Sequence, residues 1–249
     1  MTGSGRGIGH AIALGFAAEA AAVFLVGRTR ERLEDTAASI RARGGVAHPV
    51  VCDVSDERAV RALADTVSAE AGRLDVLVNC AALRMHQLGD PTAYRKPTVD
   101  VTVEEWDRVM GTNVRGPFLL ARALFPLLRA AGRASVIDVS AGAATSGEGG
   151  RAPYAASKAG LEALSRTLAS EWRDAGIAVN VLVPDARVVH EDHVRGVREP
   201  TAGARYVVPE TLVPPAIHLA TSGVSGQRIL ALAWNAANGF GGWERWEAR

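Results

Sequence analysis

The sequence has few cysteines, no long apolar run and almost no net charge. Cys52 and Cys80 are the only cysteines among 249 residues, which excludes a disulfide framework and favours a reducing compartment. The formal net charge of +1 gives no electrostatic support for a nucleic-acid partner or an anionic membrane surface. No apolar run reaches the roughly 18 residues of a transmembrane helix, and no signal-peptide pattern opens the chain. We therefore expect a cytoplasmic protein without nucleic-acid or membrane partners.

Helical and strand-like patterns alternate along the chain, and 48% of its residues are hydrophobic, enough for a sizeable core. Short apolar runs at 22–26 and 74–79 have the length of buried strands, whereas 8–20 and 56–71 have helical spacing. The other expected helices cover 30–43, 103–130 (one long helix or two abutting ones), 153–175 and 208–221, and the other expected strands cover 47–52, 134–140, 178–183 and 227–232. This alternation predicts an α/β fold, a doubly wound parallel sheet with helices on both faces. No boundary interrupts it, so we expect a single domain over residues 1–249.

Two longer segments, 86–100 and 184–206, follow neither period and contain proline among mixed polar residues. Loops of this length in a compact domain are commonly functional. We expect both segments to line a substrate pocket, with 184–206 as the substrate loop.

A glycine-rich turn, with Gly3, Gly7 and Gly9, precedes the first apolar helix. Glycine allows positive φ angles and a close approach of the backbone to a ligand. The helix start offers unpaired N–H groups and the positive end of the helix dipole, which suit a pyrophosphate. By itself the motif fits an ordinary glycine-rich loop equally well.

Tyr154 and Lys158 are four residues apart at the start of an expected helix, so they share one face. A nearby ammonium favours the phenolate and lowers the pKa of a tyrosine, which can then exchange a proton with a carbonyl or alcohol oxygen. For an isolated YxxxK, a packed tyrosine and a solvated lysine would be the better interpretation. The glycine turn lies at the expected distance upstream of this pair, and this favours the interpretation of Tyr154 and Lys158 as catalytic residues.

The TGxxxGxG pattern of residues 2–9 and the YxxxK pattern of 154–158 resemble the short-chain dehydrogenase/reductase family, and the likeness continues along most of the chain. The resemblance implies a Rossmann-type fold and an oxidoreductase that interconverts a small-molecule carbonyl and alcohol by hydride transfer. It implies Tyr154 as the acid/base, Lys158 on the nicotinamide ribose and Asn113 as the support of a water chain. The expected cofactor-binding residues are Gly3, Ser4, Arg6, Gly7, Ile8, Gly9, Arg28, Asp53, Val54, Asn79, Ala81, Tyr154, Lys158 and Pro184.

Simpler interpretations exist for some of these residues. Asn113 fits a local helix kink, and Asp53 fits an Asx turn or a helix cap.

The expected cofactor is NADP(H) rather than NAD(H). Where an NAD(H) site has an acidic residue after the second strand, this chain has Gly27 followed by Arg28, and Arg6 lies inside the glycine turn. Guanidinium groups suit a 2′-phosphate because they donate charge-assisted, bidentate hydrogen bonds. The alternative is that Arg28 belongs to a solvated helix start.

The chain departs from the family pattern at its start and at the catalytic serine. The apolar strand that precedes Thr2-Gly3 in the family is absent, so we expect the native chain to begin upstream, which an intact-mass measurement would check. The family spacing from Tyr154 places Ala141 where the serine is expected. Ser140 is one residue earlier and reaches the substrate only if the strand end bulges, so both outcomes remain open.

Two further segments depart from the family pattern. Asp185 and Val189 replace residues that the family places near the nicotinamide, so an extra carboxylate is expected close to it. Trp234, Trp243 and Trp246 fit a substrate pocket, a subunit contact or plain packing of the tail onto the core. His190, Asp192 and His193 invite a metal interpretation, but they lack a third ligand in helical spacing, so no metal site is expected.

Two competing functions remain: a non-redox NADP(H)-binding protein of degenerate site, and carbonyl chemistry without hydride transfer, such as dehydration or aldol-type proton transfer. The resemblance also implies a homo-oligomer, a dimer or tetramer, formed through the helices at 103–130 and 154–175.

Overall fold

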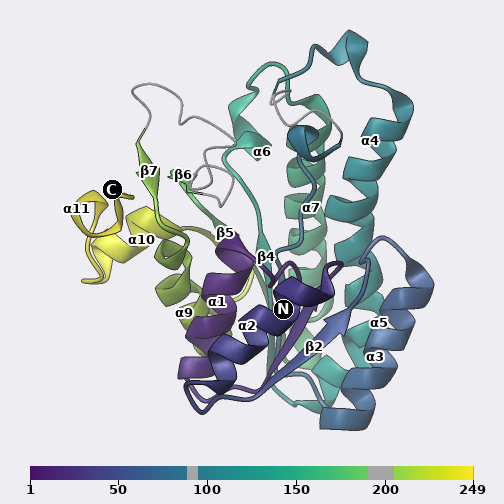
Figure 1. Cartoon of the computed structure of the whole chain (residues 1–249), viewed down its shortest axis with the longest axis vertical. Helices are drawn as coiled ribbons and strands as arrows, with labels where there is room; N and C mark the ends of the chain where they lie inside the picture. The colour runs from purple at the N-terminus through teal and green to yellow at the C-terminus, as the bar shows by residue number, and fades with distance from the viewer. Residues whose placement is uncertain (89–94, 190–204, 249) are drawn as a thin grey trace.

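The computed structural model describes residues 1–88, 95–189 and 205–248 (Figure 1). The expected loops at 86–100 and 184–206 therefore lie partly outside the described residues, and His190, Asp192 and His193 lie wholly outside them. Within the described part, no helix is long and apolar enough to span a membrane.

The centre of the fold is a twisted set of parallel strands. β1 (Val23–Gly27) pairs with β2 (Ala47–Val51). Four further strands pair in the order β3 (Val76–Asn79), β4 (Ala134–Val139), β5 (Ile177–Val183) and β8 (Arg228–Leu230). The predicted parallel α/β architecture is confirmed.

Met1 and Thr2 lie between β1 and β3 and connect the two groups of strands. The Val26 N–H donates to the Met1 carbonyl (2.9 Å), and the Thr2 N–H donates to the Val78 carbonyl (3.0 Å). The Met1 amino group donates to the Phe24 carbonyl (3.0 Å). These bonds fix the glycine turn, which begins at the next residue, at the carboxyl edge of both β1 and β3.

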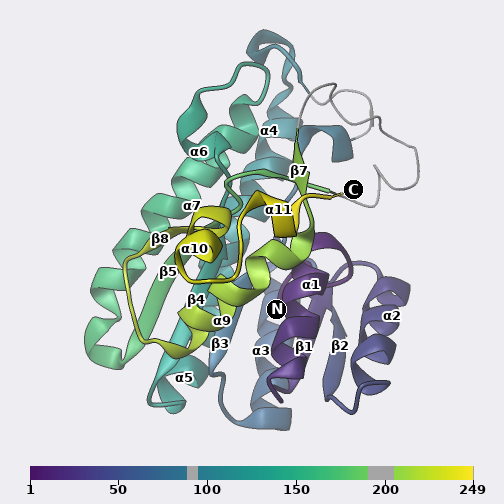
Figure 2. The ribbon, with the colours of Figure 1, turned by 90° about the vertical axis from the view of Figure 1, so that its left-hand side faces the viewer.

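Helices cover both faces of the sheet (Figures 1 and 2). One face carries α1 (Gly7–Ala18), α2 (Arg30–Arg41) and α9 (Val213–Thr221). The other carries α3 (Glu57–Ala71), α5 (Gly116–Ala130) and α7 (Ala152–Glu171). The segment 103–130, expected as one long helix or two abutting ones, consists of α4 (Val103–Met110), a π-helical turn over Gly111–Arg115, and α5.

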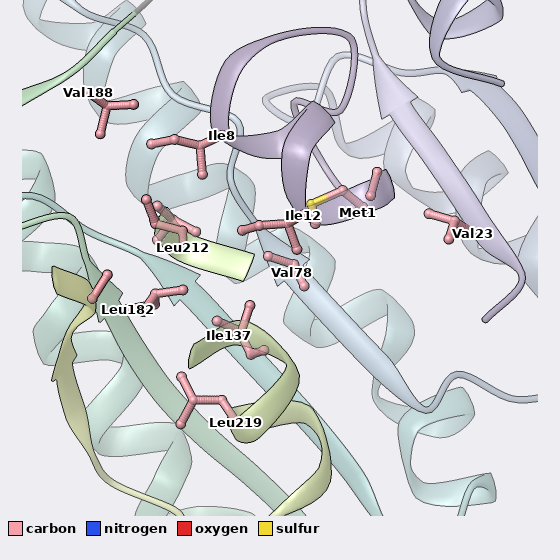
Figure 3. Close-up of a cluster of buried hydrophobic side chains, with 14 of the residues drawn as sticks. Met1, Ile8, Ile12, Val23, Val78, Ile137, Leu182, Val188, Leu212 and Leu219 are labelled. Carbon is pink, nitrogen blue, oxygen red and sulfur yellow. The ribbon is translucent and has the colours of Figure 1, made fainter. Parts of the chain in front are cut away.

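Each helix layer has its own apolar core because alternate strand residues point to opposite faces. On one side Val23, Val78 and Ile137 pack with Ile12 of α1 and Leu219 of α9 (Figure 3). On the other side, the residues next to them in the strands pack under α3, α5 and α7; these are Phe24, Leu77 and Val136.

Short elements surround the carboxyl edge of the sheet. They are α6 (Ala143–Ser146), β6 (Arg187–Val188), β7 (Tyr206–Val207), α10 (Ala231–Ala237) and α11 (Trp243–Trp246). The C-terminal segment turns back beside α9 (Figure 2), and Trp246 is buried in the cluster beneath α1 and α9. For Trp246, the structure shows packing of the tail onto the core.

Candidate active site

The glycine turn brings three backbone segments into close contact. Gly3 and Gly7 adopt φ of 66° and 55°, which side chains disfavour. A Cβ at Gly9 would lie 2.2 Å from the Gly3 carbonyl oxygen, and a Cβ at Gly3 would lie 2.9 Å from Ala81 Cα. The residue before α1, Arg6, makes no side-chain capping hydrogen bond to the first turn. The first turn of this helix can therefore bind an anion with its own N–H groups.

Two adjoining hollows form one groove along the carboxyl edge of the sheet. Gly3, Arg6 and Ala81 line both of them. One hollow contains Arg28, Asp53 and Val54, and the other contains Gly7, Ile8, Gly9, Tyr154, Lys158 and Pro184. Of the expected cofactor-binding residues, all but Ser4 and Asn79 lie along this groove.

Ser4 and Asn79 lie behind the groove and hold its walls. The Ser4 hydroxyl donates to the Val26 carbonyl at 3.4 Å, and Asn79 Nδ2 donates to Asp138 Oδ1 at 2.7 Å. Both side chains are buried, and the structure places neither in contact with the groove.

The hollow at the end of β1 is rich in arginine. Arg28, Arg32 and Arg6 line it, and Gly27 leaves no acidic side chain at the end of the strand. Asp53 accepts from the backbone N–H and the hydroxyl of Ser55 at 2.9 and 2.7 Å, an Asx turn. Burial acts to raise the pKa of Asp53, but the Ser55 bonds and the Arg28 charge lower it overall.

Tyr154 and Lys158 meet at the other end of the groove, one turn apart on α7. Lys158 Nζ lies 5.9 Å from the Tyr154 ring centroid. The lysine side chain is only 2% exposed, and its ammonium donates to the Val139 carbonyl at 2.7 Å. Both side chains therefore have fixed positions at the end of β4.

A second cation adjoins the tyrosine and was not predicted from the sequence. The Arg84 guanidinium carbon lies 5.9 Å from the Tyr154 ring centroid. Burial acts to raise the pKa of Tyr154, but the charges of Arg84 and Lys158 outweigh it and the pKa lies below its ordinary value. The sequence offered one signal for Arg84, its position after β3, because this places it at the same carboxyl edge of the sheet as the other site residues.

Asn113 joins the loop after β3 to α7. It is fully buried in the π-helical turn, where its Oδ1 accepts from the Leu83 N–H at 2.7 Å. Its Nδ2 donates to the Leu83 carbonyl (3.0 Å) and the Ser157 hydroxyl (2.9 Å). The local helix irregularity considered for this residue is present, and its amide fixes the residue before Arg84.

The Ser140 hydroxyl is engaged away from the Tyr154 end of α7. It donates to Glu162 Oε1 at 2.7 Å, and Glu162 pairs with Arg228 at 3.0 Å. Glu162 lies about two turns beyond Tyr154 on α7. Ser140 and Ala141 both line the groove, but the Ser140 hydroxyl is bonded to Glu162 and Ala141 carries no hydroxyl.

A cavity of about 540 Å³ opens beside Tyr154, and its wall combines apolar residues with charged and hydroxyl-bearing ones. Its charged and hydroxyl-bearing residues are Arg84, Thr145, Ser146, Glu148, Arg151, Asp185, Arg187, Tyr206 and Arg228. The Asp185 carboxylate accepts from the Leu232 and Ala233 N–H groups at 2.6 and 3.0 Å, so it caps the first turn of α10. The residues that line this cavity do not include Trp234, Trp243 or Trp246.

The comparison with known proteins agrees with this geometry. The short chain dehydrogenase family model matches residues 1–190. The chain is 31% identical over 228 residues to D-threitol dehydrogenase of Mycolicibacterium smegmatis, which covers 89% of this chain and 84% of that protein.

Solved structures are similar over almost the whole length. Gluconate 5-dehydrogenase from Burkholderia cenocepacia, in complex with NADP and tartrate, has 29% identity and a TM-score of 0.80, over 92% of this chain and 91% of that one. L-sorbose reductase from Gluconobacter frateurii, complexed with NADPH and L-sorbose, has 27% identity and a TM-score of 0.82, over 92% of both chains. The chain belongs to the short-chain dehydrogenase family.

Proposed function

We propose that this protein is an NADP(H)-dependent oxidoreductase that interconverts a small polar carbonyl compound and its alcohol. The observation that carries the proposal is one continuous groove. It begins at Arg28, passes the open start of α1 and ends at the Tyr154–Lys158 pair.

The residues along the groove fit a dinucleotide phosphate. The glycine turn leaves space where any Cβ would collide with backbone, and the α1 start suits the pyrophosphate. Arg28 and Arg6 suit the 2′-phosphate, and Lys158 suits the nicotinamide ribose. The similar gluconate 5-dehydrogenase and L-sorbose reductase structures contain NADP and NADPH. Bound NADPH supplies the hydride for the carbonyl carbon.

Tyr154 exchanges the proton at the substrate oxygen. In the reducing direction its hydroxyl gives a proton to the carbonyl oxygen, and in the oxidising direction its phenolate takes the alcohol proton. The neighbouring ammonium and guanidinium favour the phenolate, which explains why the pKa of Tyr154 is lowered despite its burial.

The cavity beside Tyr154 has groups that can bind a hydrophilic substrate. Its wall includes the guanidinium groups of Arg84, Arg151 and Arg228 beside apolar residues. The printed names of the relatives, D-threitol dehydrogenase, gluconate 5-dehydrogenase and L-sorbose reductase, refer to polyhydroxylated compounds. We therefore infer a polyol, ketose or sugar acid as the substrate class.

An assay of NADPH absorbance over a panel of such carbonyl compounds tests the function, with Tyr154→Phe as the diagnostic variant. We expect turnover by the wild type and a loss of about 10²–10⁴-fold in the variant, because its general acid is gone. NADPH binding, followed by nucleotide fluorescence, should remain in the variant.

Two results would contradict this function. Tight NADPH binding without turnover over the whole panel would favour a non-redox binding protein. Product formation without oxidation of the nucleotide would favour dehydration or aldol-type chemistry.

We also infer a homo-oligomer formed through the helices at 103–130 and 154–175. Large apolar side chains are exposed on α4 and α5, at Val103, Trp106 and Phe118. Light scattering of the purified chain tests this inference, and a monomer at micromolar concentration would contradict it. The cytoplasmic location stays a prediction from the sequence.

A further inference from the structure

The oxygen that reacts at this site needs more than one hydrogen-bond donor. It gains negative charge as the carbonyl becomes an alcohol, and donors aimed at that charge lower the barrier. Tyr154 supplies one donor. At the end of β4, Ala141 has no hydroxyl, and the Ser140 hydroxyl donates to Glu162 instead.

Arg84 is placed to act as the second donor. It lines both the groove at the Tyr154 end and the cavity beside it, so it stands where the two meet. Its guanidinium carbon lies 5.9 Å from the Tyr154 ring centroid. Tyr154 also lines both the groove and the cavity, so an oxygen bound by the phenol lies close to the guanidinium.

The backbone that carries Arg84 is held on both sides. Asn113 binds the N–H and the carbonyl of Leu83 through its amide, at 2.7 and 3.0 Å. The Arg84 N–H donates to Gln87 Oε1 at 2.8 Å. Donors fixed before the reaction need no reorganisation when charge develops, which is the condition for electrostatic stabilisation.

We propose that Arg84 is a catalytic residue that donates a hydrogen bond to the reacting substrate oxygen, the task that neither Ser140 nor Ala141 performs in this chain. This inference rests on the proposed function. In the reduction, NADPH gives a hydride to the carbonyl carbon and becomes NADP⁺. The C=O π pair moves to the oxygen, and Tyr154 transfers its O–H proton there.

The arginine itself neither gains nor loses a proton in this step. A guanidinium stays protonated at neutral pH, so Arg84 stabilises the developing alkoxide as a donor and leaves the proton transfer to Tyr154. The same guanidinium faces the phenolate in the oxidising direction and favours it there.

Arg84→Gln tests the proposal in the full-length protein with NADPH and the best carbonyl substrate of the panel. We expect kcat to fall by roughly 10²–10³-fold, as for the loss of one oxyanion donor, with NADPH affinity unchanged. Arg58→Gln, which removes an exposed arginine of α3, is the matched control and should leave kcat unchanged. Adding Ala141→Ser to the Arg84→Gln variant should recover about tenfold or more in kcat, because it returns a donor to the groove.

A second measurement does not depend on turnover. Titration of the tyrosinate absorbance in the nucleotide-free protein, taken as a difference from Tyr154→Phe, reports the phenol of Tyr154. We expect Arg84→Gln to raise the pKa of Tyr154, and Arg84→Lys to raise it less because the lysine keeps the positive charge.

Distinct outcomes separate this inference from the proposed function. Wild-type turnover with an unchanged kcat in Arg84→Gln would overturn the role of Arg84 alone. A rise in KM for anionic substrates only, without loss of kcat, would also overturn it and would assign Arg84 to substrate binding. Absence of wild-type turnover over the whole panel would overturn both proposals.

Discussion

Arg28 stands at the position that separates NADP(H) from NAD(H) binding. It lines the hollow at the end of β1, next to Gly27, which carries no carboxylate for a ribose 2′-hydroxyl. Arg28→Gln is expected to weaken NADPH binding by about 1.5–3 kcal/mol, or roughly 10- to 150-fold in Kd, because a charge-assisted contact to the phosphate is lost.

NADH binding should change little in the same variant, since NADH has no 2′-phosphate. Titration of both nucleotides by fluorescence measures the two constants, with the exposed Arg43→Gln as the control. An equal loss of affinity for NADPH and NADH would show that Arg28 does not recognise the phosphate.

The two thiols are expected to be unreactive at neutral pH. Burial raises the pKa of Cys80 to about 11, and burial and the carboxylates of Asp53 and Asp56 raise that of Cys52 to about 11. At pH 8 roughly one thiol in a thousand would be ionised, against about one in ten for a thiol of ordinary pKa 9. Iodoacetamide labelling followed by mass spectrometry should therefore be far slower in the native protein than in the unfolded chain. Equal labelling rates would contradict the raised pKa values of these thiols.

At the residue scale, the sequence predicted those site residues whose spacing along the chain forms a recognisable motif. Gly3, Gly7 and Gly9 and the Tyr154–Lys158 pair form local patterns, so their places in one groove could be anticipated. Arg84 could not, because no local pattern distinguishes an arginine that meets a phenol seventy residues later in the chain. The direction of the Ser140 hydroxyl depends on Glu162, another distant residue.

At the scale of the elements, the start of α3 is determined by a local N-cap. Asp56 precedes the helix, and its carboxylate accepts from the N–H groups of Arg58 and Ala59 at 2.8 and 3.4 Å. Asp56→Ala should lower the free energy of unfolding by about 0.5–2 kcal/mol, because the first turn loses its cap. Urea denaturation measures this value.

Asp65→Ala is the matched control for the cap, since it removes an exposed carboxylate from the same helix. We expect its effect to stay within about 0.5 kcal/mol. An equal loss in the two variants would show that net charge, rather than the cap, determines the stability of α3.

Some boundaries of the helices and strands have tertiary causes. The sequence left open whether 103–130 is one helix or two, and the π-helical turn that joins α4 to α5 places Asn113 against Leu83 of a distant loop. The strand expected over 227–232 ends at Leu230 because Asp185 caps the turn that starts α10. Neither the amide nor the carboxylate has a sequence neighbour that reveals its partner.

Over the whole molecule, the alternation of strands and helices was enough to predict the parallel sheet and its two helix layers. Parallel strands bring their carboxyl ends to one edge, so the turns after β1, β2, β3, β4 and β5 line a common crevice. This arrangement explains why residues as distant as Gly3, Asp53 and Pro184 lie along one groove. Met1 and Thr2, hydrogen-bonded between β1 and β3, hold the glycine turn at this edge.

The central claim is that this groove holds one NADP(H) with its nicotinamide at Tyr154, and a crystal structure of the NADP⁺ complex tests it most directly. We predict the 2′-phosphate at Arg28, the pyrophosphate at the start of α1, and a nicotinamide ribose hydroxyl within hydrogen-bond distance of Lys158 Nζ. A nucleotide bound outside the groove, or a nicotinamide ring on the far side of the molecule from the Tyr154 hydroxyl, would contradict the account.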